Sequence, residues 1–398
     1  MSNKLYIDFT HALPRPGIKF HGGAAYVKEV VQQAVKYVSE GKSNKQIVLL
    51  WPQDYTPTDS IEEKIRSCSR MEIENVSESI AEVAYEKYST LFLPLLGVTE
   101  FPILKKIKTA NPDMRIILTI HGLRLLDEKL DFYNADYYTD KMKKIGVVAE
   151  EALLLPIKRF LYIRMLSKYV PYCNEIFTVS NYSLTSIIKY SKPKKITLFY
   201  ESPFNRDDAV KQLVEPSEEG KYILFVSGNR PEKNLSRAMD AYLEWARVIT
   251  SPPKMLITGV TEAVQNALRA KYFRGNDFPG RHIEFLDYVS TSDLQRLYRN
   301  AYFLLYPSKS EGFGLPVLEA ALQGCPSTAA IGTSIPEVLG STAEYFDPYS
   351  KADIISSLSF MSDPKNNKKM RKQLSNLLPA LTLQMEVSNE NLMSRLFR

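Results

Sequence analysis

The sequence is poor in cysteine and has no long apolar run. Its three cysteines, Cys68, Cys173 and Cys325, lie far apart, and none has a CxxC or metal-ligand spacing. No apolar stretch approaches the roughly 18 residues that a membrane span needs. The first residues enter a strand pattern directly and lack the shape of a signal peptide. These absences predict a cytoplasmic protein with no transmembrane segment, whose cysteines are small core or surface residues.

The charge is mild and is concentrated in one place. A net charge of +6 over 398 residues falls short of the footprint of a nucleic-acid-binding protein. Lys141 to Lys168 interleave basic and apolar side chains, which predicts a helix broken or kinked at Pro156. Two interpretations stay open. The segment either docks peripherally on an anionic membrane, at the inner face of the plasma membrane, or is an ordinary helix with one core face.

Length and pattern predict an α/β fold of two domains. A chain of 398 residues fits two domains of roughly 200 residues each. Apolar runs predict strands at 5–8, 47–50, 91–93, 116–119, 176–179, 222–226, 255–258, 283–286, 303–306 and 327–329. Helical patterns between them are typical of doubly wound parallel sheets. Turn-rich composition near 201–220 predicts domains at 1–202 and 203–375, with a C-terminal helix at 376–398 that stays on the second domain or crosses back to the first.

The stretch Glu311-Gly-Phe-Gly-Leu-Pro-Val-Leu-Glu319 is the most informative part of the chain. It follows a predicted strand, and Pro316 stands where a first helical turn begins, which predicts strand, glycine loop and helix. Its two glycines let the backbone approach a ligand, and the loop N–H groups with the helix N-terminus can hold an anion. The flanking glutamates can accept hydrogen bonds from hydroxyl groups. An anion beside hydroxyl groups indicates a nucleotide sugar.

A second loop, Ser227-Gly-Asn-Arg-Pro-Glu-Lys-Asn234, follows the predicted strand at 222–226. Asn234 is a candidate N-cap for the next helix, which places Arg230 and Lys233 just ahead of a helix N-terminus. Two cations beside a positive helix end repel each other unless they share an anion such as a diphosphate. The alternative is a solvated turn that carries two surface cations.

The first half of the chain has two further features. His121 directly follows the predicted strand at 116–120, where it either lies beside a ligand or caps the strand. Gly22 and Gly23 precede a predicted helix at 26–38, either as a glycine loop near a ligand or as a tight strand-to-helix connection.

These residues carry a resemblance to a known family. Residues 311–319 resemble the EX7E signature of glycosyltransferase family 4, and 227–234 resemble its Arg…Lys-Asn phosphate element. Weaker similarities exist in both halves. In the second half, 285–290 resemble the family's base-binding strand end, and 335–338 resemble the loop and helix that follow its signature. In the first half, Gly22-Gly23 resemble the family's N-terminal glycine loop, and His121 resembles the histidine after its fourth strand. The resemblance implies the GT-B fold, with two Rossmann-like doubly wound domains facing across a cleft. The second domain would bind the donor and the first the acceptor.

The resemblance also implies a role for each residue. Arg230 and Lys233 would bind the donor diphosphate, and Glu319 would bind the ribose hydroxyls. Glu311 would hold the transferred sugar and His121 would contact its far side, so that Glu311, His121, Arg230 and Lys233 form the implied catalytic set. The remaining implied donor contacts are Gly22, Gly23, Gly228, Tyr288, Val289, Gly312, Phe313, Gly314 and Leu315.

Family members retain the anomeric configuration and need no metal. The sequence agrees, since no DxD-type pair stands at a strand end with a phosphate element. Two positions depart from the family pattern. Asp287 stands where a glycine is common, and Lys309 precedes Ser310-Glu311, which leaves the nucleobase and the sugar pocket open.

These features predict a retaining hexosyltransferase without a cofactor. It would move a sugar from a UDP-, GDP- or TDP-linked donor to a glycan or lipid-linked acceptor in cell-surface polysaccharide or glycoconjugate synthesis. The alternatives are a non-catalytic GT-B subunit that supports a partner transferase and a nucleotide-sugar epimerase or phosphorylase of the same fold. A dehydrogenase is disfavoured, because neither glycine loop is the GxGxxG fingerprint.

Overall fold

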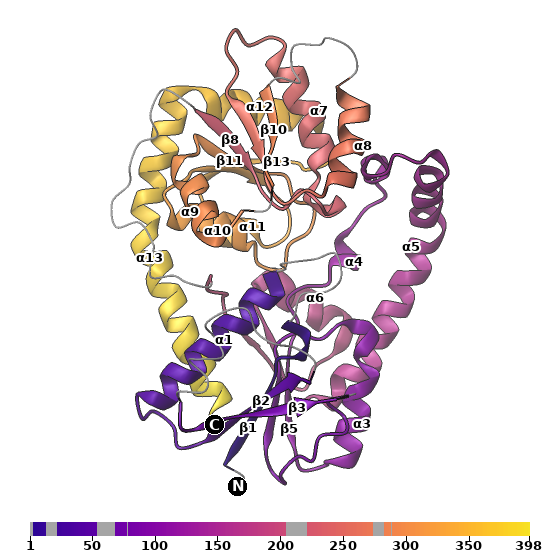
Figure 1. The fold of residues 1–398 in the computed structure, drawn as a ribbon, viewed down its shortest axis with the longest axis vertical. Coiled ribbons are helices and arrows are strands. Elements are labelled where there is room, and N and C mark those ends of the chain that lie inside the picture. The colour runs from indigo at the N-terminus through magenta and orange to yellow at the C-terminus, as the bar shows by residue number, and fades with distance from the viewer. Residues whose placement is uncertain are drawn as a thin grey trace. The chain divides into compact units, whose positions relative to one another are not determined.

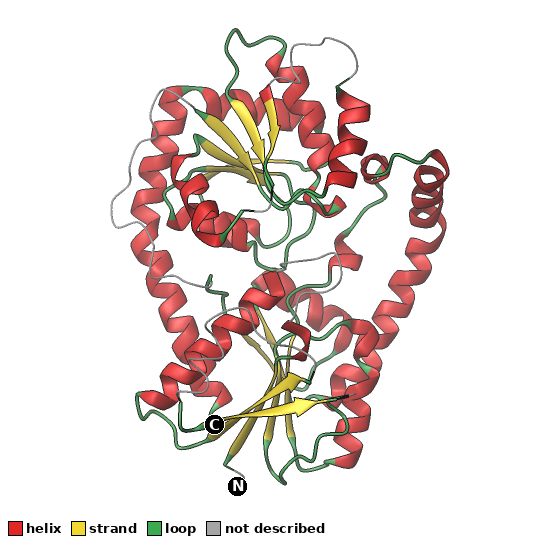
Figure 2. Ribbon diagram, in the orientation of Figure 1, coloured by secondary structure: helices red, strands yellow, loops and turns green. Residues whose placement is uncertain are grey.

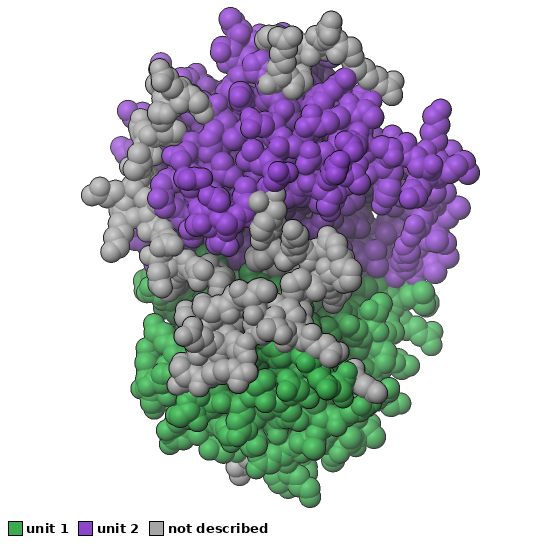
Figure 3. Space-filling view, in the orientation of Figure 1, with its two compact units in different colours: residues 1–123, 160–207, 383–398 green, residues 124–159, 208–382 purple. Residues whose placement is uncertain are grey.

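A computed structural model describes residues 3–12, 22–53, 68–77, 79–203, 221–273, 282–287 and 289–398. The chain divides into two compact units (Figure 3). Unit 1 comprises residues 1–123, 160–207 and 383–398, and unit 2 comprises 124–159 and 208–382.

Unit 1 is built on a seven-stranded sheet in the order β3-β2-β1-β4-β5-β6-β7 (Figure 1). Its strands are β1 (Lys4–Asp8), β2 (Gln46–Pro52), β3 (Met71–Val76), β4 (Thr90–Leu93), β5 (Arg115–Thr119), β6 (Glu175–Thr178) and β7 (Ile196–Leu198). All of their pairings are parallel. The strand order reverses between β1 and β4, as in other doubly wound sheets.

Helix α1 (Gly22–Ser39) packs on this sheet with one apolar face. Its Val27, Val30, Val31, Ala34 and Val38 are at most 3% exposed, as expected for the buried face of an amphipathic helix. The other helical segments of unit 1 are η1 (Thr10–Ala12), η2 (Val98–Glu100), α3 (Pro102–Ala110), η4 (Val170–Tyr172) and α6 (Asn181–Ser191).

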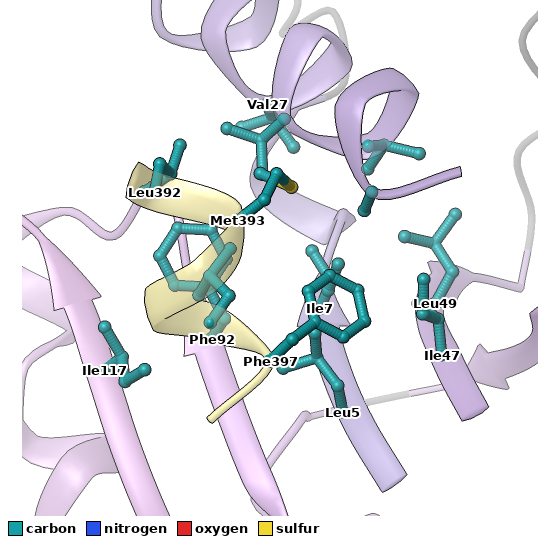
Figure 4. Close-up of a cluster of buried hydrophobic side chains, with 14 of the residues drawn as sticks. Leu5, Ile7, Val27, Ile47, Leu49, Phe92, Ile117, Leu392, Met393 and Phe397 are labelled. Carbon is teal, nitrogen blue, oxygen red and sulfur yellow. The ribbon is translucent and has the colours of Figure 1, made fainter. Parts of the chain in front are cut away.

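The C-terminal end of the chain completes the core of unit 1. Leu392, Met393 and Phe397 belong to one buried cluster with side chains of α1 and of strands β1, β2, β4 and β5 (Figure 4). The Arg395 guanidinium donates to the buried Glu175 carboxylate at 2.9 Å. Because helix α13 (Pro364–Leu396) begins in unit 2, the C-terminal helix belongs to both units.

Unit 2 is built on a six-stranded parallel sheet in the order β10-β9-β8-β11-β12-β13, covered by helices (Figure 2). Its strands are β8 (Tyr222–Phe225), β9 (Lys254–Ile257), β10 (Ile283–Phe285), β11 (Phe303–Tyr306), β12 (Ser327–Ala330) and β13 (Ala343–Phe346). Its helical segments are α4 (Arg124–Asp127), η3 (Phe132–Tyr137), η6 (Pro231–Lys233), α7 (Leu235–Ala246), α8 (Glu262–Tyr272), α9 (Thr291–Asn300), α10 (Leu315–Leu322), α11 (Ile335–Leu339) and α12 (Lys351–Ser362). The order reverses between β8 and β11.

The fold class predicted from the sequence is confirmed, since both units are doubly wound parallel sheets. The grouping of residues 124–159 differs from the expected division, because they cluster with unit 2 although they precede its first strand. Buried ion pairs of Asp131 with Arg237 and Lys309 hold this segment there. Most of the turn-rich stretch at 201–220 lies outside the described residues.

Helix α5 (Lys141–Tyr169) continues through Pro156, with its first part in unit 2 and its last part in unit 1. The predicted break at Pro156 therefore does not end the helix. None of the helices in the described part of the chain is long and apolar enough to cross a membrane.

Candidate active site

The candidate site of unit 2 lies on the two strands between which the sheet order reverses. Strands β8 and β11 are neighbours, with Phe303 paired to Ile223 and Leu304 to Leu224. The chain leaves β8 into the loop that carries Lys233, and it leaves β11 into the loop that carries Glu311. In doubly wound sheets, ligands bind at this point, off the carboxyl ends of the strands.

Lys233 is a buried cation that pairs with Glu311. Its side chain is 3% exposed, and its Nζ donates to Glu311 Oε1 at 2.5 Å and to the Tyr306 hydroxyl at 2.7 Å. Burial lowers the pKa of Lys233 below its ordinary value, against the pull of the Glu311 carboxylate. The interpretation of Lys233 as a solvated surface cation is therefore wrong.

Hydrogen bonds fix both the carboxylate and the backbone of Glu311. Burial alone would raise its pKa, but the Lys233 ammonium and the Tyr306 hydroxyl, which donates at 2.6 Å, bring the pKa below the ordinary value. Its backbone N–H donates to Thr333 Oγ1 at 3.2 Å, and its carbonyl accepts from Ser334 Oγ at 3.1 Å. The carboxylate is therefore ionised and its position is fixed by the loop after β12.

Helix α10 begins directly after the glycine loop, as predicted. Gly314 is its N-cap with φ of 103°, a left-handed conformation that favours glycine, and Pro316 lies in the first turn. The helix ends at a Schellman motif, because Gly324 N–H donates to Ala321 O and Cys325 N–H donates to Ala320 O, both at 2.9 Å. A glycine N-cap has no side chain to cover the helix N-terminus, and such an end attracts anions.

Glu319 lies inside α10 and has little support for a negative charge. Its Oε2 accepts one hydrogen bond from the Tyr298 hydroxyl at 3.2 Å. Burial raises the pKa of Glu319 to about 7, although Tyr298 and the charge of Lys233 oppose the shift. A carboxyl group poised near neutrality gains most from ligand groups that donate hydrogen bonds to its ionised form.

The loop after β8 departs from the prediction at Asn234. This residue stands at the N-cap position of α7 but has φ of 65°, and its side chain makes no capping bond. Its Nδ2 instead donates to Pro307 O at 3.2 Å and to Pro348 O at 2.7 Å. The N–H of Leu235 donates to the Tyr137 hydroxyl at 3.0 Å. Asn234 is therefore the N-cap residue of α7 by position, as predicted, but its side chain joins the loops after β8 and β11 and does not cap the helix.

Arg230 and Gly228 lie in the same loop. The Arg230 guanidinium is half-exposed, with Nε 3.3 Å from Glu232 Oε1. A Cβ atom on Gly228 would lie 2.7 Å from a Leu235 methyl and 2.8 Å from a Val260 methyl, so close packing alone accounts for this glycine.

The unit 1 candidate, His121, has both ring nitrogens occupied. Nδ1 lies 2.5 Å from Glu201 Oε1, and Nε2 lies 3.0 Å from the carbonyl oxygen of Pro94. Burial alone would lower the pKa of His121, but the hydrogen bond and charge of Glu201 raise it above the ordinary value. Because a carbonyl and a carboxylate both accept, these two partners favour the ring with a proton on each nitrogen. Its edge packs on the Tyr26 ring.

Gly22, Gly23 and Val289 are the remaining predicted donor contacts that lie in described ranges outside the two loops. Gly22 and Gly23 form the first turn of α1, so the helix begins earlier than the predicted Tyr26. Val289 lies after β10 and Tyr288 falls outside the described residues. In the described ranges, no group of three or more His, Cys, Asp and Glu side chains is placed to hold a metal ion.

Several residues of the site were not found from the sequence. Tyr306 and Tyr298 hold the two glutamates, and Glu201 pairs with His121 although its turn-rich surroundings pointed to a linker. Tyr306 ends a strand five residues before Glu311, which was an available signal. The pairing of Glu201 with a histidine 80 positions away left no trace in the local pattern.

Comparison with known proteins places the second half in a family. The model of the glycosyl transferases group 1 matches residues 206–376. O-antigen chain mannosyltransferase B of Escherichia coli is 33% identical over 127 residues, covering 32% of this chain and 33% of the relative. O-antigen chain mannosyltransferase RfbU of Salmonella typhimurium is 30% identical over 193 residues, covering 47% of this chain and 51% of the relative. The chain thus spans about a third and about half of these curated relatives.

Solved structures extend the likeness to the whole chain. Sucrose-phosphate synthase from Thermosynechococcus elongatus has a TM-score of 0.61 at 14% identity, covering 98% of this chain and 99% of that one. Anabaena HepE, solved with UDP and glucose, has a TM-score of 0.61 at 12% identity, covering 99% of this chain and 100% of that one. At such identities the likeness shows the fold, and it agrees with two Rossmann-like units. Residues 206–376 therefore match the group 1 glycosyl transferases, and the two Rossmann-like units together have the GT-B fold.

Proposed function

We propose that the chain is a retaining hexosyltransferase that moves a sugar from a nucleotide-sugar donor to a glycan or lipid-linked acceptor in polysaccharide synthesis. The observation that carries this proposal is the buried pair of Lys233 and Glu311, which directly precedes the glycine-capped N-terminus of α10 at the point where the sheet order reverses. The names of the curated relatives favour mannose as the transferred sugar.

The diphosphate of the donor is assigned to Lys233, Arg230 and the N-terminal end of α10. An ammonium group has three N–H donors, and Lys233 uses two of them on Glu311 and Tyr306. The third is available for a phosphate oxygen. Arg230 adds a second, half-exposed cation, and the backbone of Gly312 to Leu315 approaches the anion. Glu319 accepts hydrogen bonds from the ribose hydroxyls.

The sugar is assigned to Glu311 of unit 2, and His121, Gly22 and Gly23 are proposed as the sugar-binding residues of unit 1. In the reaction, the bond between C1 and the phosphate oxygen breaks and the nucleoside diphosphate leaves with the electron pair. The acceptor oxygen bonds to C1 on the same face, and its proton passes to the leaving phosphate oxygen. Catalysis then comes from positioning and from stabilising the leaving group. His121 acts as a fixed cation and not as a base, since its two partners favour a proton on each nitrogen.

Donor turnover tests this function. The chain is incubated with GDP-mannose or UDP-glucose, each with and without methyl α-mannoside as an acceptor, and nucleotide release is measured. We expect acceptor-dependent release from one donor, unchanged by EDTA because Lys233 and Arg230 supply the positive charge. Conversion of a donor without acceptor would indicate an epimerase, release only with inorganic phosphate a phosphorylase, and binding without turnover a non-catalytic subunit.

We also propose that helix α5 docks on an anionic membrane that bears a lipid-linked acceptor. Its first part exposes large apolar side chains that are 44–74% accessible, namely Met142, Ile145, Leu153, Leu154 and Ile157. Exposed lysines, Lys141 and Lys143, are interleaved with them, and this mixture suits an anionic lipid surface. Arg159 does not contribute, because its guanidinium donates to backbone carbonyls, including Leu125 O at 3.0 Å.

Vesicle sedimentation tests the docking. The chain should sediment with vesicles that contain anionic phosphatidylglycerol, less so with pure phosphatidylcholine, and binding should fall by about tenfold when salt is raised from low to high. Leu153→Glu should weaken binding, whereas Val248→Glu, at a residue that is 80% exposed elsewhere in unit 2, should not. Equal binding by both variants, or a stable dimer that Leu153→Glu dissociates, would remove the membrane proposal.

A further inference from the structure

Residues 124–137 of unit 2, here called the strap, contact both loops of the candidate donor site. The strap precedes the first strand of unit 2, and its helical segment η3 packs against η6, α7 and α8. Toward the loop after β8, Arg124 Nη1 donates to Glu232 Oε1 at 2.5 Å, and the Tyr137 hydroxyl accepts from Leu235 N at 3.0 Å. Toward the loop after β11, Asp127 Oδ2 accepts from Ser310 Oγ at 3.0 Å. Asp131 pairs with Arg237 and Lys309. One segment therefore touches the neighbours of Lys233 and of Glu311.

The centre of the strap is a buried charge cluster. Asp131, Arg237 and Lys309 are 4%, 6% and 5% exposed. The Arg237 guanidinium donates to both Asp131 oxygens, at 2.7 and 3.1 Å, and Lys309 Nζ donates to Asp131 Oδ2 at 2.9 Å. Lys309 Nζ also donates to Asn134 Oδ1 at 2.6 Å. Burying three charges costs free energy, so removing one partner changes the electrostatic balance of the other two.

Lys309 is the point where the strap and both loops meet. Its side chain is bound to the strap, and its backbone N–H donates to Glu232 O at 2.8 Å, in the turn that presents Lys233. It stands two residues before Glu311. Pairing with Asp131 alone would not require a lysine here, because Arg237 already balances that carboxylate.

We propose that Lys309 is a positioning residue: through Asp131 and the strap it fixes the loop that carries Glu311, and so aligns Glu311 with Lys233. This inference rests on the proposed function for its kinetic consequence, but its structural content stands without it. It also gives a reason for the lysine that departs from the family pattern.

The rival explanation is that the cluster only fastens the strap to unit 2. Lys271 provides the matched control, because its Nζ lies 2.6 Å from Asp136 Oδ2 and joins the strap to α8, away from the Glu311 loop. Lys309→Met leaves the Asp131–Arg237 pair balanced, so the unit is expected to fold. Lys271→Met cuts a strap contact of the same chemical type. A fastening role predicts no selective loosening of the Glu311 loop by Lys309→Met.

Hydrogen exchange of the full chain, without ligand, decides between them. In Lys309→Met, the amides of residues 308–314 should exchange about tenfold faster than in the wild type, whereas Lys271→Met should leave them unchanged. Ser310→Ala, which deletes one hydroxyl and its bond to Asp127, should act in the same direction and less strongly, and it serves if Lys309→Met fails to fold. Unchanged exchange at 308–314, or equal acceleration by Lys271→Met, would overturn the proposal.

Kinetics with GDP-mannose or UDP-glucose form the second arm. Lys309→Met should lower kcat about tenfold while donor KM changes less than about threefold, since the phosphate cations stay in place. A wild type that turns over neither donor would contradict the proposed function and leave the exchange result to decide the role of Lys309. If the wild type turns over a donor and Lys309→Met turns it over equally well, this inference alone is overturned.

Discussion

Replacing Lys233 by methionine is expected to lower the affinity for a nucleotide sugar by about tenfold or more and turnover by about a thousandfold. The buried ammonium offers its remaining N–H to the diphosphate and holds Glu311 at 2.5 Å. Without it, the leaving group loses a buried cation and the Glu311 carboxylate loses its ionic partner. Calorimetric titration with the donor that is turned over measures the affinity, and steady-state kinetics measure turnover.

The control for this substitution is Lys254→Met in the same unit. Lys254 is exposed, and its Nζ lies 3.7 Å from Glu284, so its loss should change neither affinity nor stability noticeably. Breaking the buried pair at Lys233 should cost about 3 kcal/mol of unfolding free energy, and binding is therefore measured well below the melting temperature of the variant. Unchanged donor affinity in folded Lys233→Met would contradict the diphosphate assignment.

Donor binding is expected to tighten about tenfold between pH 6 and pH 8, through the ionisation of Glu319. In the ligand-free protein its pKa is about 7, and the ribose hydroxyls donate best to the ionised carboxylate. Binding therefore lowers this pKa and releases a proton below neutrality. A nucleotide sugar is the right probe, because its diphosphate has no terminal group that titrates in this range. Titrations in buffers of different ionisation enthalpy count the released proton.

Glu319→Gln should abolish this pH dependence and weaken binding at pH 8. Because the pKa is raised from 4.5, the contribution of Glu319 to the free energy of unfolding is present below pH 4.5 and is lost as the pH rises through about 7. The wild type should therefore lose about 3 kcal/mol over this window relative to the glutamine variant. The same pH dependence of donor binding in both proteins would show that another group titrates.

The sequence predicted the central strands of both sheets and missed three at the edges. Strands β3, β7 and β13 lie at the ends of their sheets, and the first two contain no buried position. An interior parallel strand is buried on both faces and therefore has an apolar run, whereas an edge strand such as Met71–Val76 alternates with charged residues. Apolar runs therefore find the interior strands of a parallel sheet, and among the described edge strands they found β10 and missed β3, β7 and β13.

The sequence predicted those site residues that lie close together in the chain. Glu311, Lys233 and the start of α10 come shortly after strand ends in the chain, and the residues that give each loop its chemistry are neighbours in the sequence. The strap could not be predicted, because the contact between Asp131 and Lys309 spans 178 positions. The side-chain contacts of Asn234 could not be predicted for the same reason. Its place before a helix indicated an N-cap, but two carbonyl oxygens of distant loops bind its side chain instead.

The most direct test of sugar transfer at this site is the anomeric configuration of the product. The disaccharide formed from GDP-mannose and methyl α-mannoside is isolated, and its one-bond C1–H1 coupling is measured by NMR, beside the product of the Glu311→Gln variant. We expect an α-linked product, as in the α-linked donor, formed at a much lower rate by the variant. A β-linked product, or the same rate in the variant, would contradict retention at a site built around Glu311.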